Sequence, residues 1–264
     1  MTTRRIPRLI PLACLAVLLL AGCSKRPPEP AATPTPPSAA APAPAAPAVP
    51  QTTNDLVSLG DAPAYVALAS GESVVVHSEP AGGKTVDLMP PKLSWGTPTP
   101  FLVREARRVG GKVWYRVLLP KRPNESSGWV LADQVRTAAR EYRALVDLSE
   151  RRLRLYKGDD LVRNFPVGIG RPGTPTPTGR FFVTVRLRPP QISHVYGTWA
   201  LGLSAYSQVL AQFGTGDGQI ALHGTGISTD LGQQVSNGCV RLDNVAISTL
   251  AVVLEPGSPV DIQA

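Results

Sequence analysis

The distribution of apolar and polar residues changes along the chain and divides the chain into distinct stretches. Residues 9–21 are almost continuously apolar, residues 24–50 are dominated by proline and alanine, and short apolar runs fill most of the remainder. Alternation over four to eight positions is typical of a β-strand with one buried face. We therefore expect a mainly β protein whose folded part begins well after the N-terminus.

Residues 59–138 contain several strand-like runs separated by glycine and proline, including Val74–His77 and Val113–Leu118. So many short strands without helical periodicity predict a small β-barrel or sandwich. The Trp114–Val117 run, followed by Gly128-Trp129-Val130, is similar to bacterial Src-homology-3-like modules, several of which bind cell wall. A packing or spacer domain without a ligand of its own is the open alternative.

Residues 141–264 show a second series of strands and one helix. Leu153 and Leu155 alternate with arginines before a turn at Lys157–Asp160, which predicts a hairpin. Further on, Asp243 or Asn244 can cap a helix with apolar residues at i, i+3, i+4 and i+7: Ile247, Leu250, Ala251 and Leu254. We expect a β-rich domain with one helix near its C-terminus.

The N-terminal pattern is typical of an export signal. Arginines precede an apolar run that is too short to span a bilayer, and Leu20-Ala21-Gly22-Cys23 follows. This tetrad resembles the lipobox of bacterial lipoproteins, in which the cysteine is acylated. We expect residues 1–22 to be a signal peptide, Cys23 to carry lipid, and residues 23–58 to be a Pro/Ala-rich linker. The alternative is an ordinary signal peptide with a chance cysteine.

Composition and charge narrow the function classes. The chain is 43% hydrophobic, which excludes wholesale disorder, and has 27 basic and 19 acidic residues. Removing residues 1–22 deletes three arginines, so the processed charge falls from +8 to 24 − 19 = +5. We expect a protein held by lipid at the outer face of a membrane, in the periplasm or an equivalent cell-wall space, with no nucleic-acid partner.

Processing would leave Cys239 as the one thiol, because Cys14 leaves with the signal and Cys23 is lipidated. A lone cysteine is either an inert buried residue or a reactive group. Its neighbours Gly238 and Asn237 favour a turn rather than an apolar interior. His223 lies upstream and could deprotonate the thiol, although a structural histidine is equally compatible with the spacing.

His223-Gly224-Thr225 followed by Ser236–Leu242 resembles the signature of L,D-transpeptidases with a YkuD-type catalytic domain. Gly173–Phe181 resembles the Thr-Pro-x-Gly segment of that family, and Tyr196-Gly197 gives further support. The resemblance covers essentially the whole second domain. It implies a β-sandwich acyltransferase that cross-links peptidoglycan stem peptides through a thioester on Cys239, with carbapenem-type inhibitors as expected ligands.

The same resemblance implies a role for each residue of the signature. His223 would be the base, with its ring fixed by the Gly224 carbonyl, and the N–H groups of Gly238 and Cys239 would stabilise the oxyanion. Arg241 would bind a substrate carboxylate, although an ion pair on the protein surface is equally compatible. The other expected substrate-binding residues are Ser236, Asn237, Thr225 and Tyr196.

One position departs from the family pattern: Asn237 stands where the family commonly has histidine, and asparagine cannot titrate. We expect activity to survive. Two alternatives stay open, namely an L,D-carboxypeptidase or hydrolase that delivers the same thioester to water, and a catalytically inactive wall-binding lipoprotein. No cofactor is implied, and His194, His223 and Cys239 lack the paired spacing of a zinc site, so we expect no metal.

Overall fold

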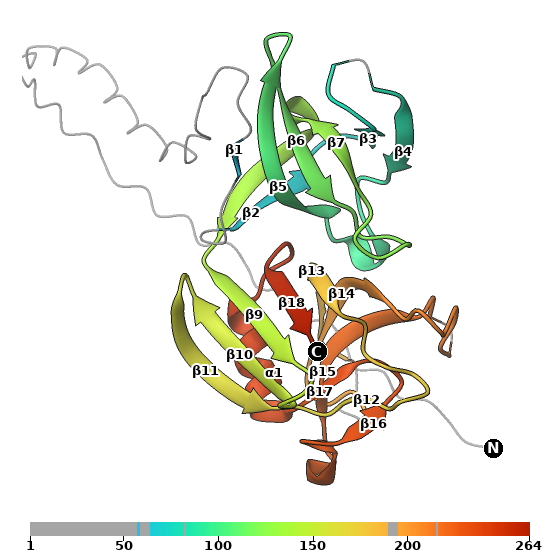
Figure 1. Cartoon of the computed structure of the whole chain (residues 1–264), viewed down its shortest axis with the longest axis vertical. Coiled ribbons are helices and arrows are strands. Elements are labelled where there is room, and N and C mark those ends of the chain that lie inside the picture. Colours follow the sequence, from blue (N-terminus) through green and yellow to red (C-terminus); the bar gives the residue numbers. More distant parts are fainter. Residues whose placement is uncertain (1–56, 59–63, 82, 190–194, 215) are drawn as a thin grey trace, which may run out of the picture. The chain divides into compact units, whose positions relative to one another are not determined.

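A computed structural model describes residues 57–58, 64–81, 83–189, 195–214 and 216–264. The predicted signal peptide, the lipidation site Cys23 and nearly all of the predicted linker lie outside the described residues. Within the described residues, no helix is long and apolar enough to cross a membrane. Residues 44–264 form one compact unit, and the prediction of a mainly β fold is confirmed (Figure 1).

The first sheet has eight strands, and its strand pairs are antiparallel. Seven of them follow the order β4-β3-β7-β6-β5-β2-β8, and β1 pairs with β5. The strands are β1 (Val57–Ser58), β2 (Ala64–Ala69), β3 (Val74–His77), β4 (Thr85–Met89), β5 (Pro100–Val109), β6 (Lys112–Leu118), β7 (Ser127–Leu131) and β8 (Val135–Arg140). Phe101, Tyr115 and Val130 belong to its buried core. The short apolar runs separated by glycine and proline are what made these strands predictable.

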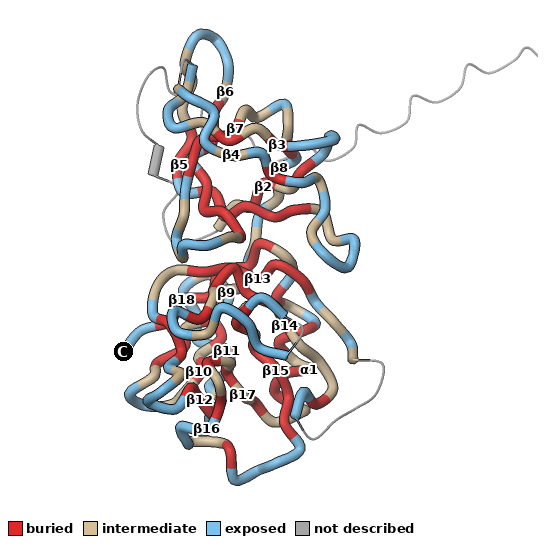
Figure 2. The backbone as a smooth tube through the Cα atoms, turned by 90° about the vertical axis from the view of Figure 1, so that its right-hand side faces the viewer, coloured by how far each residue is buried: buried red, intermediate tan, exposed pale blue. Residues whose placement is uncertain are grey.

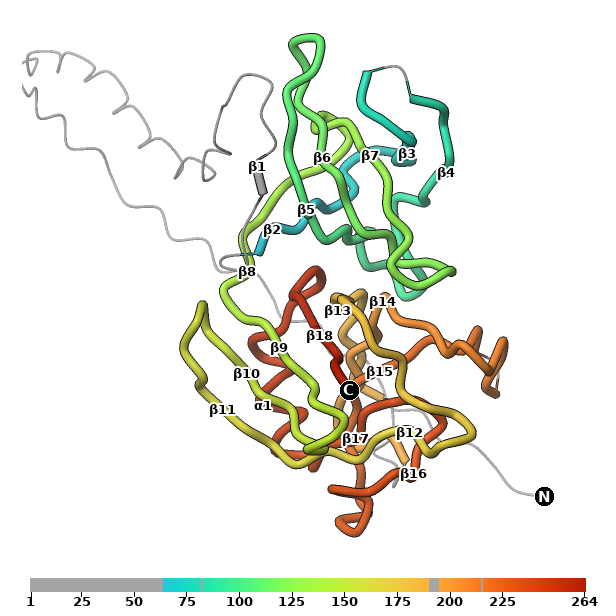
Figure 3. Tube along the Cα trace, viewed as in Figure 1, coloured from blue at the N-terminus to red at the C-terminus, as the bar shows by residue number. Residues whose placement is uncertain are grey.

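The second sheet also has eight strands, in the order β11-β10-β9-β18-β13-β14-β15-β17, and β12 and β16 form a separate parallel pair (Figure 3). The strands are β9 (Tyr142–Asp147), β10 (Arg152–Lys157), β11 (Asp160–Pro166), β12 (Ile169–Gly170), β13 (Gly179–Leu187), β14 (Ala200–Tyr206), β15 (Gln219–Thr225), β16 (Gln234–Ser236), β17 (Val240–Asp243) and β18 (Pro259–Gln263). The predicted hairpin is confirmed as β10–β11, with Gly158 in the left-handed region of its turn.

The helix α1 (Asn244–Val253) begins where the sequence predicts it, and Asp243 is its N-cap. The Asp243 carboxylate accepts hydrogen bonds from the N–H groups of Val245 and Ala246, which have no partner within the helix. Figure 2 shows buried backbone, in red, along strands of both sheets. Ile247 and Leu250 are fully buried against the core of the second sheet, whereas Val245 and Val252 are exposed. The helix therefore covers β15 and β17, the two strands that position the candidate site.

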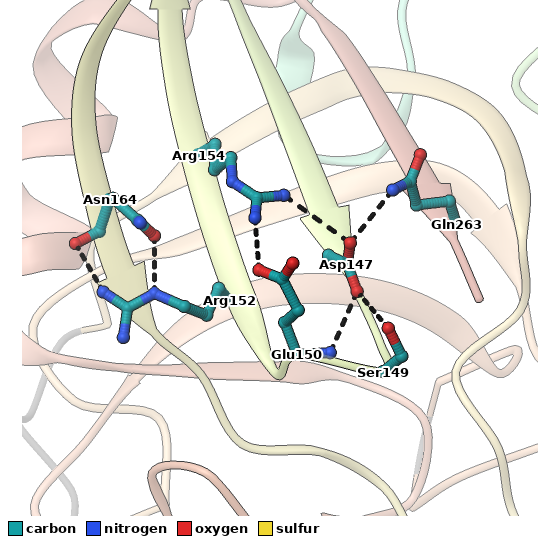
Figure 4. A network of polar contacts seen from close by, with 7 residues as sticks. All are labelled: Asp147, Ser149, Glu150, Arg152, Arg154, Asn164 and Gln263. Atoms are coloured by element: carbon teal, nitrogen blue, oxygen red, sulfur yellow. Dashed lines mark hydrogen bonds and ion pairs between the residues drawn. The ribbon is translucent and has the colours of Figure 1, made fainter.

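A polar network fastens the C-terminal strand to the first hairpin of the second sheet (Figure 4). The Asp147 carboxylate accepts hydrogen bonds from the Glu150 N–H at 2.9 Å, the Ser149 hydroxyl at 2.7 Å and the Gln263 amide at 3.0 Å. These bonds, with a smaller contribution from Arg154, hold the pKa of Asp147 well below its usual range. The network fixes one end of β18 beside β9, to which β18 runs parallel.

Side chains of the two sheets also share one buried cluster. Leu102 and Leu118 of the first sheet pack with Phe182 of β13. The contact is close at Gly257, where an added Cβ would come within 2.1 Å of a Val66 methyl group. Glycine is therefore required at residue 257, which also has a positive φ of 90°.

Candidate active site

The parallel pairing of β15 with β17 brings the two halves of the predicted signature together. In this register Leu222 pairs with Val240 and His223 pairs with Arg241. Cys239 directly precedes β17, so its backbone lies about one strand spacing, roughly 4.8 Å, from that of β15. His223 and Cys239 consequently line the same pocket, although sixteen positions separate them in the sequence.

His223 is held in one orientation and in its neutral form. Its ring is 2% exposed, and Nδ1 lies 2.8 Å from the carbonyl oxygen of Gly224. Burial lowers the pKa of His223 from 6.5 to about 4, with a further lowering by the Arg241 charge; the Gly224 and Val195 backbones and the Asp230 carboxylate oppose this shift. A neutral ring that donates Nδ1–H to the Gly224 carbonyl presents Nε2 as a proton acceptor.

Glycine is required at residue 224 because the Asn244 side chain occupies the space that a larger side chain would need. A Cβ at this position would meet Asn244 Oδ1 at 2.4 Å and the Cα of Gly197 at 3.0 Å. Asn244 Oδ1 accepts the N–H of Thr198 at 2.9 Å and so fixes the segment that follows Tyr196. The Tyr196 ring lies 5.2 Å from the His223 ring and lines the pocket.

Cys239 keeps part of its surface in the pocket and forms no disulfide. Desolvation raises the pKa of the thiol, and hydrogen bonding to the Ala221 backbone and the positive charge of Arg241 partly offset the increase. The pKa of His223 is lowered and the pKa of Cys239 is raised, and the two shifts have the same consequence. At neutral pH both shifts favour the uncharged forms, a thiol at Cys239 and a neutral imidazole at His223.

The turn that carries Cys239 is organised by the buried Ser236 hydroxyl. This hydroxyl accepts the Gly238 N–H at 3.0 Å and donates to the Cys239 carbonyl at 2.6 Å. Gly238 adopts a positive φ of 115°, which favours glycine. Because the Gly238 N–H is already bonded to Ser236, an oxyanion would have to displace this bond before it could use that donor.

Arg241 lines the pocket and is paired with Asp230, which the sequence did not identify. Arg241 Nη1 is 2.7 Å from Asp230 Oδ2, and the side chains are 18% and 10% exposed. The Thr225 hydroxyl donates to the same carboxylate oxygen at 3.1 Å. The structure therefore places Arg241 and Thr225 in a largely buried ion-pair network, and Asp230 competes with any substrate carboxylate for the guanidinium.

Asn237 lines the pocket and bonds to Arg171, an exposed residue that the sequence gave no reason to select. The Asn237 side-chain oxygen accepts a hydrogen bond from the Arg171 guanidinium, while the Thr174 hydroxyl donates to the Ser236 carbonyl at 3.2 Å. The Arg171–Thr174 segment is thereby fixed against the turn that carries the thiol. Of the predicted site residues, the pocket gathers Tyr196, His223, Ser236, Asn237, Cys239 and Arg241.

Four apolar residues also line the pocket: Val195, Leu210, Phe213 and Ile220. Leu210 and Phe213 belong to the loop between β14 and β15, for which the sequence gave no site prediction. Within the described residues, no three His, Cys, Asp or Glu side chains gather in a metal-binding arrangement. His194, a member of the zinc set considered above, lies outside the described residues.

Comparison with known proteins gives a consistent result for the second half of the chain. Residues 141–262 match the family model of the L,D-transpeptidase catalytic domain, YkuD. Proteins named "Putative L,D-transpeptidase YkuD" from Bacillus licheniformis and Bacillus subtilis are 33% and 28% identical over 121 residues, which is 46% of this chain and 65% of each relative. The chain therefore spans slightly less than two thirds of the length of these relatives.

Similar solved structures include an L,D-transpeptidase from Mycobacterium smegmatis, with 14% identity, a TM-score of 0.38, and coverage of 58% of this chain and 91% of that one. The match to the family model covers nearly the whole second sheet and the pocket that holds His223 and Cys239. On these matches, residues 141–262 of the chain are similar in sequence to L,D-transpeptidase catalytic domains.

Proposed function

We propose that this protein is a peptidoglycan L,D-transpeptidase that forms cross-links between stem peptides through an acyl-enzyme on Cys239. The observation that carries the proposal is the position of Cys239 and of a neutral, oriented His223 in one pocket, which the β15–β17 pairing creates. A thiol, a base and a backbone orienter of the base are the parts that nucleophilic acyl transfer requires.

The first half of the reaction forms the acyl-enzyme. As the sulfur of Cys239 attacks the carbonyl carbon of the donor stem peptide, its proton passes to Nε2 of His223. The tetrahedral oxyanion is stabilised by the Cys239 N–H and, once its bond to Ser236 is displaced, by that of Gly238. The carbon–nitrogen bond then breaks, the proton on His223 goes to the leaving D-alanine amine, and a thioester remains on Cys239.

The second half transfers the acyl group to an amine. His223, neutral again, accepts a proton from the acceptor amine as that amine attacks the thioester. The carbon–sulfur bond then breaks, and the proton on His223 passes to the leaving Cys239 sulfur, which restores the thiol. The resting protonation states suit this sequence, because a histidine with a pKa of about 4 is uncharged at each attack. Redox chemistry and a metal are not needed for these steps.

The position of the protein in the cell follows from the N-terminal sequence. We propose that Cys23 is lipidated after removal of residues 1–22 and that residues 23–58 tether the folded part to the outer face of a membrane. The first sheet is proposed to be a Src-homology-3-like module. Near the wall, the processed charge of about +5 suits the anionic polymers of the cell envelope.

Incubation of the purified full chain with tetrapeptide muropeptides tests this function. The expected product, resolved by mass spectrometry, is a cross-linked dimer with loss of D-alanine, and Cys239→Ser should abolish it. Release of trimmed tripeptide alone would show that water is the acceptor and that the protein is an L,D-carboxypeptidase. Absence of both products, together with failure of a carbapenem to acylate Cys239, would identify an inactive wall-binding protein.

A further inference from the structure

The loop between β14 and β15, residues 207–218, forms one side of the catalytic pocket through Ser207, Leu210, Phe213 and Gly218. Its ends are joined by a hydrogen bond from the Ser207 N–H to the Gly218 carbonyl at 2.9 Å, and its tip by reciprocal bonds between Phe213 and Gly216. Between these points, three loop carbonyls bind one side chain that comes from the first sheet.

That side chain is Arg122, in the connection between β6 and β7. Its Nη1 donates to the Ser207 carbonyl at 2.6 Å, and its Nη2 donates to the carbonyls of Leu210 and Asp217 at 3.0 and 2.9 Å. The guanidinium also lies 5.0 Å from the centre of the Tyr206 ring, at the start of the loop. One planar group with several donors thus fixes the start, middle and end of the loop.

A second residue of the same connection strengthens the attachment. The Asn124 amide donates to the Tyr206 carbonyl at 2.9 Å and accepts the Tyr206 N–H at 2.8 Å, and the Tyr206 hydroxyl donates to the Pro120 carbonyl at 3.2 Å. These bonds hold the last residue of β14, immediately before Ser207. The start of the loop is therefore bound to the β6–β7 connection through both Tyr206 and the Ser207 carbonyl.

The loop leaves little room for another arrangement around the guanidinium. Gly218 has a positive φ of 78°, and a Cβ there would meet the Leu210 carbonyl at 2.3 Å and Arg122 Nη2 at 2.7 Å. Backbone of the loop consequently packs directly on Arg122. Without the guanidinium, the three carbonyls would have to find water or other donors, and the loop would lose the contact that unites them.

We propose that Arg122 is a positioning residue of the active site: it holds the 207–218 loop in the shape that receives the donor stem peptide. The first sheet would then be a structural part of the catalytic pocket in addition to any wall-binding role. This inference rests on the proposed function, because the loop is assigned to the peptide that the transpeptidase reaction requires. Arg122 touches neither the thiol nor the base in the described contacts, so its effect would pass through the loop.

The test compares full-length Arg122→Ala and Arg122→Lys with a control, Arg136→Ala, which removes an exposed arginine of β8 on the same sheet. For Arg122→Ala we expect kcat/KM with a tetrapeptide donor to fall by about tenfold to about a hundredfold, mainly through KM, because the wall of the pocket is displaced. Arg122→Lys should recover part of the loss, since an ammonium can replace some of the donors but not the planar fork. The control should match the unaltered protein.

Two further measurements separate positioning from general damage. Alkylation of Cys239 by iodoacetamide, which is too small to need the loop, should proceed at the unaltered rate in Arg122→Ala. Hydrogen exchange should accelerate within residues 207–218 and stay unchanged in β15 and β17. Equal KM values for Arg122→Ala and Arg136→Ala would overturn the proposal, and so would a loss of alkylation and of β15 protection in parallel with KM.

Failure of the proposed function would give a different result. If the unaltered protein made neither cross-linked nor trimmed product, the kinetics would give no information about Arg122. Hydrogen exchange would still test its role. Faster exchange confined to residues 207–218 in Arg122→Ala would support loop positioning, and unchanged exchange there would refute it.

Discussion

The Asp230–Arg241 pair should control both the stability of the fold and the acidity of the nucleophile. The perturbation is Asp230→Asn, which keeps the shape and an acceptor oxygen but removes the charge. Loss of one partner of a buried ion pair costs about 3–5 kcal/mol. Arg241 is 18% and Asp230 10% exposed, so the pocket lets water compensate in part, and we expect a loss of about 2–3 kcal/mol.

The same substitution should lower the pKa of the Cys239 thiol. Arg241 already lowers this pKa, and without the Asp230 carboxylate its positive charge is no longer neutralised. The pKa of His223 should also fall, because Asp230 raises it. A destabilised protein with a more acidic thiol is an unusual combination, which general disruption of the fold would not produce.

Urea unfolding measures the first effect, and the pH dependence of Cys239 alkylation measures the second. Asp160→Asn, an exposed carboxylate at the start of β11, is the matched control and should change neither quantity. A change in unfolding free energy below about 0.5 kcal/mol, the size expected of a surface substitution, would refute the electrostatic reasoning. So would a thiol pKa that rises or stays constant.

Three other outcomes follow from the site. The pKa of His223 is about 4 in the folded state against 6.5 for an ordinary histidine, so its contribution of about 3 kcal/mol to the unfolding free energy is complete above pH 6.5 and is lost as the pH falls toward 4. The urea midpoints of the unaltered protein and of His223→Asn, measured at pH 7, 5 and 4, should therefore converge on acidification. Parallel curves would contradict this expectation. Gly224→Ala should lower the unfolding free energy by about 1–3 kcal/mol through overpacking against Asn244, and it should slow acylation by a carbapenem. The control Gly173→Ala, whose added Cβ meets open space, should change neither quantity. Thermal melting measures the stability, and mass spectrometry measures the acylation. Asn237→His should break the bond to Arg171 yet change the acylation rate by less than about tenfold, because the proposed base is His223. A gain of several hundredfold would show that asparagine impairs the proposed activity.

Much of the second domain could be predicted from local pattern. The β10–β11 hairpin followed from the alternation of Leu153 and Leu155 and the turn after them, and α1 followed from an apolar stripe behind the Asp243 cap. These features are local: a strand face, a turn and a helix cap are each specified by residues a few positions apart. The signature around His223 and Cys239 is also compact enough to be seen in sequence.

The partners of those residues were decided only by the tertiary structure. Arg241 is paired with Asp230, Asn237 with Arg171, and the 207–218 loop with Arg122 of the other sheet. A charged or amide side chain in sequence specifies what it can bond but not which group will be within reach, because reach depends on strand order and register. The placement of β18 between β9 and β13, rather than beside its sequence neighbour β17, is a result of the same kind (Figure 1). Local sequence thus determined the proposed nucleophile and base, and the packing of distant segments determined the charges and walls around them.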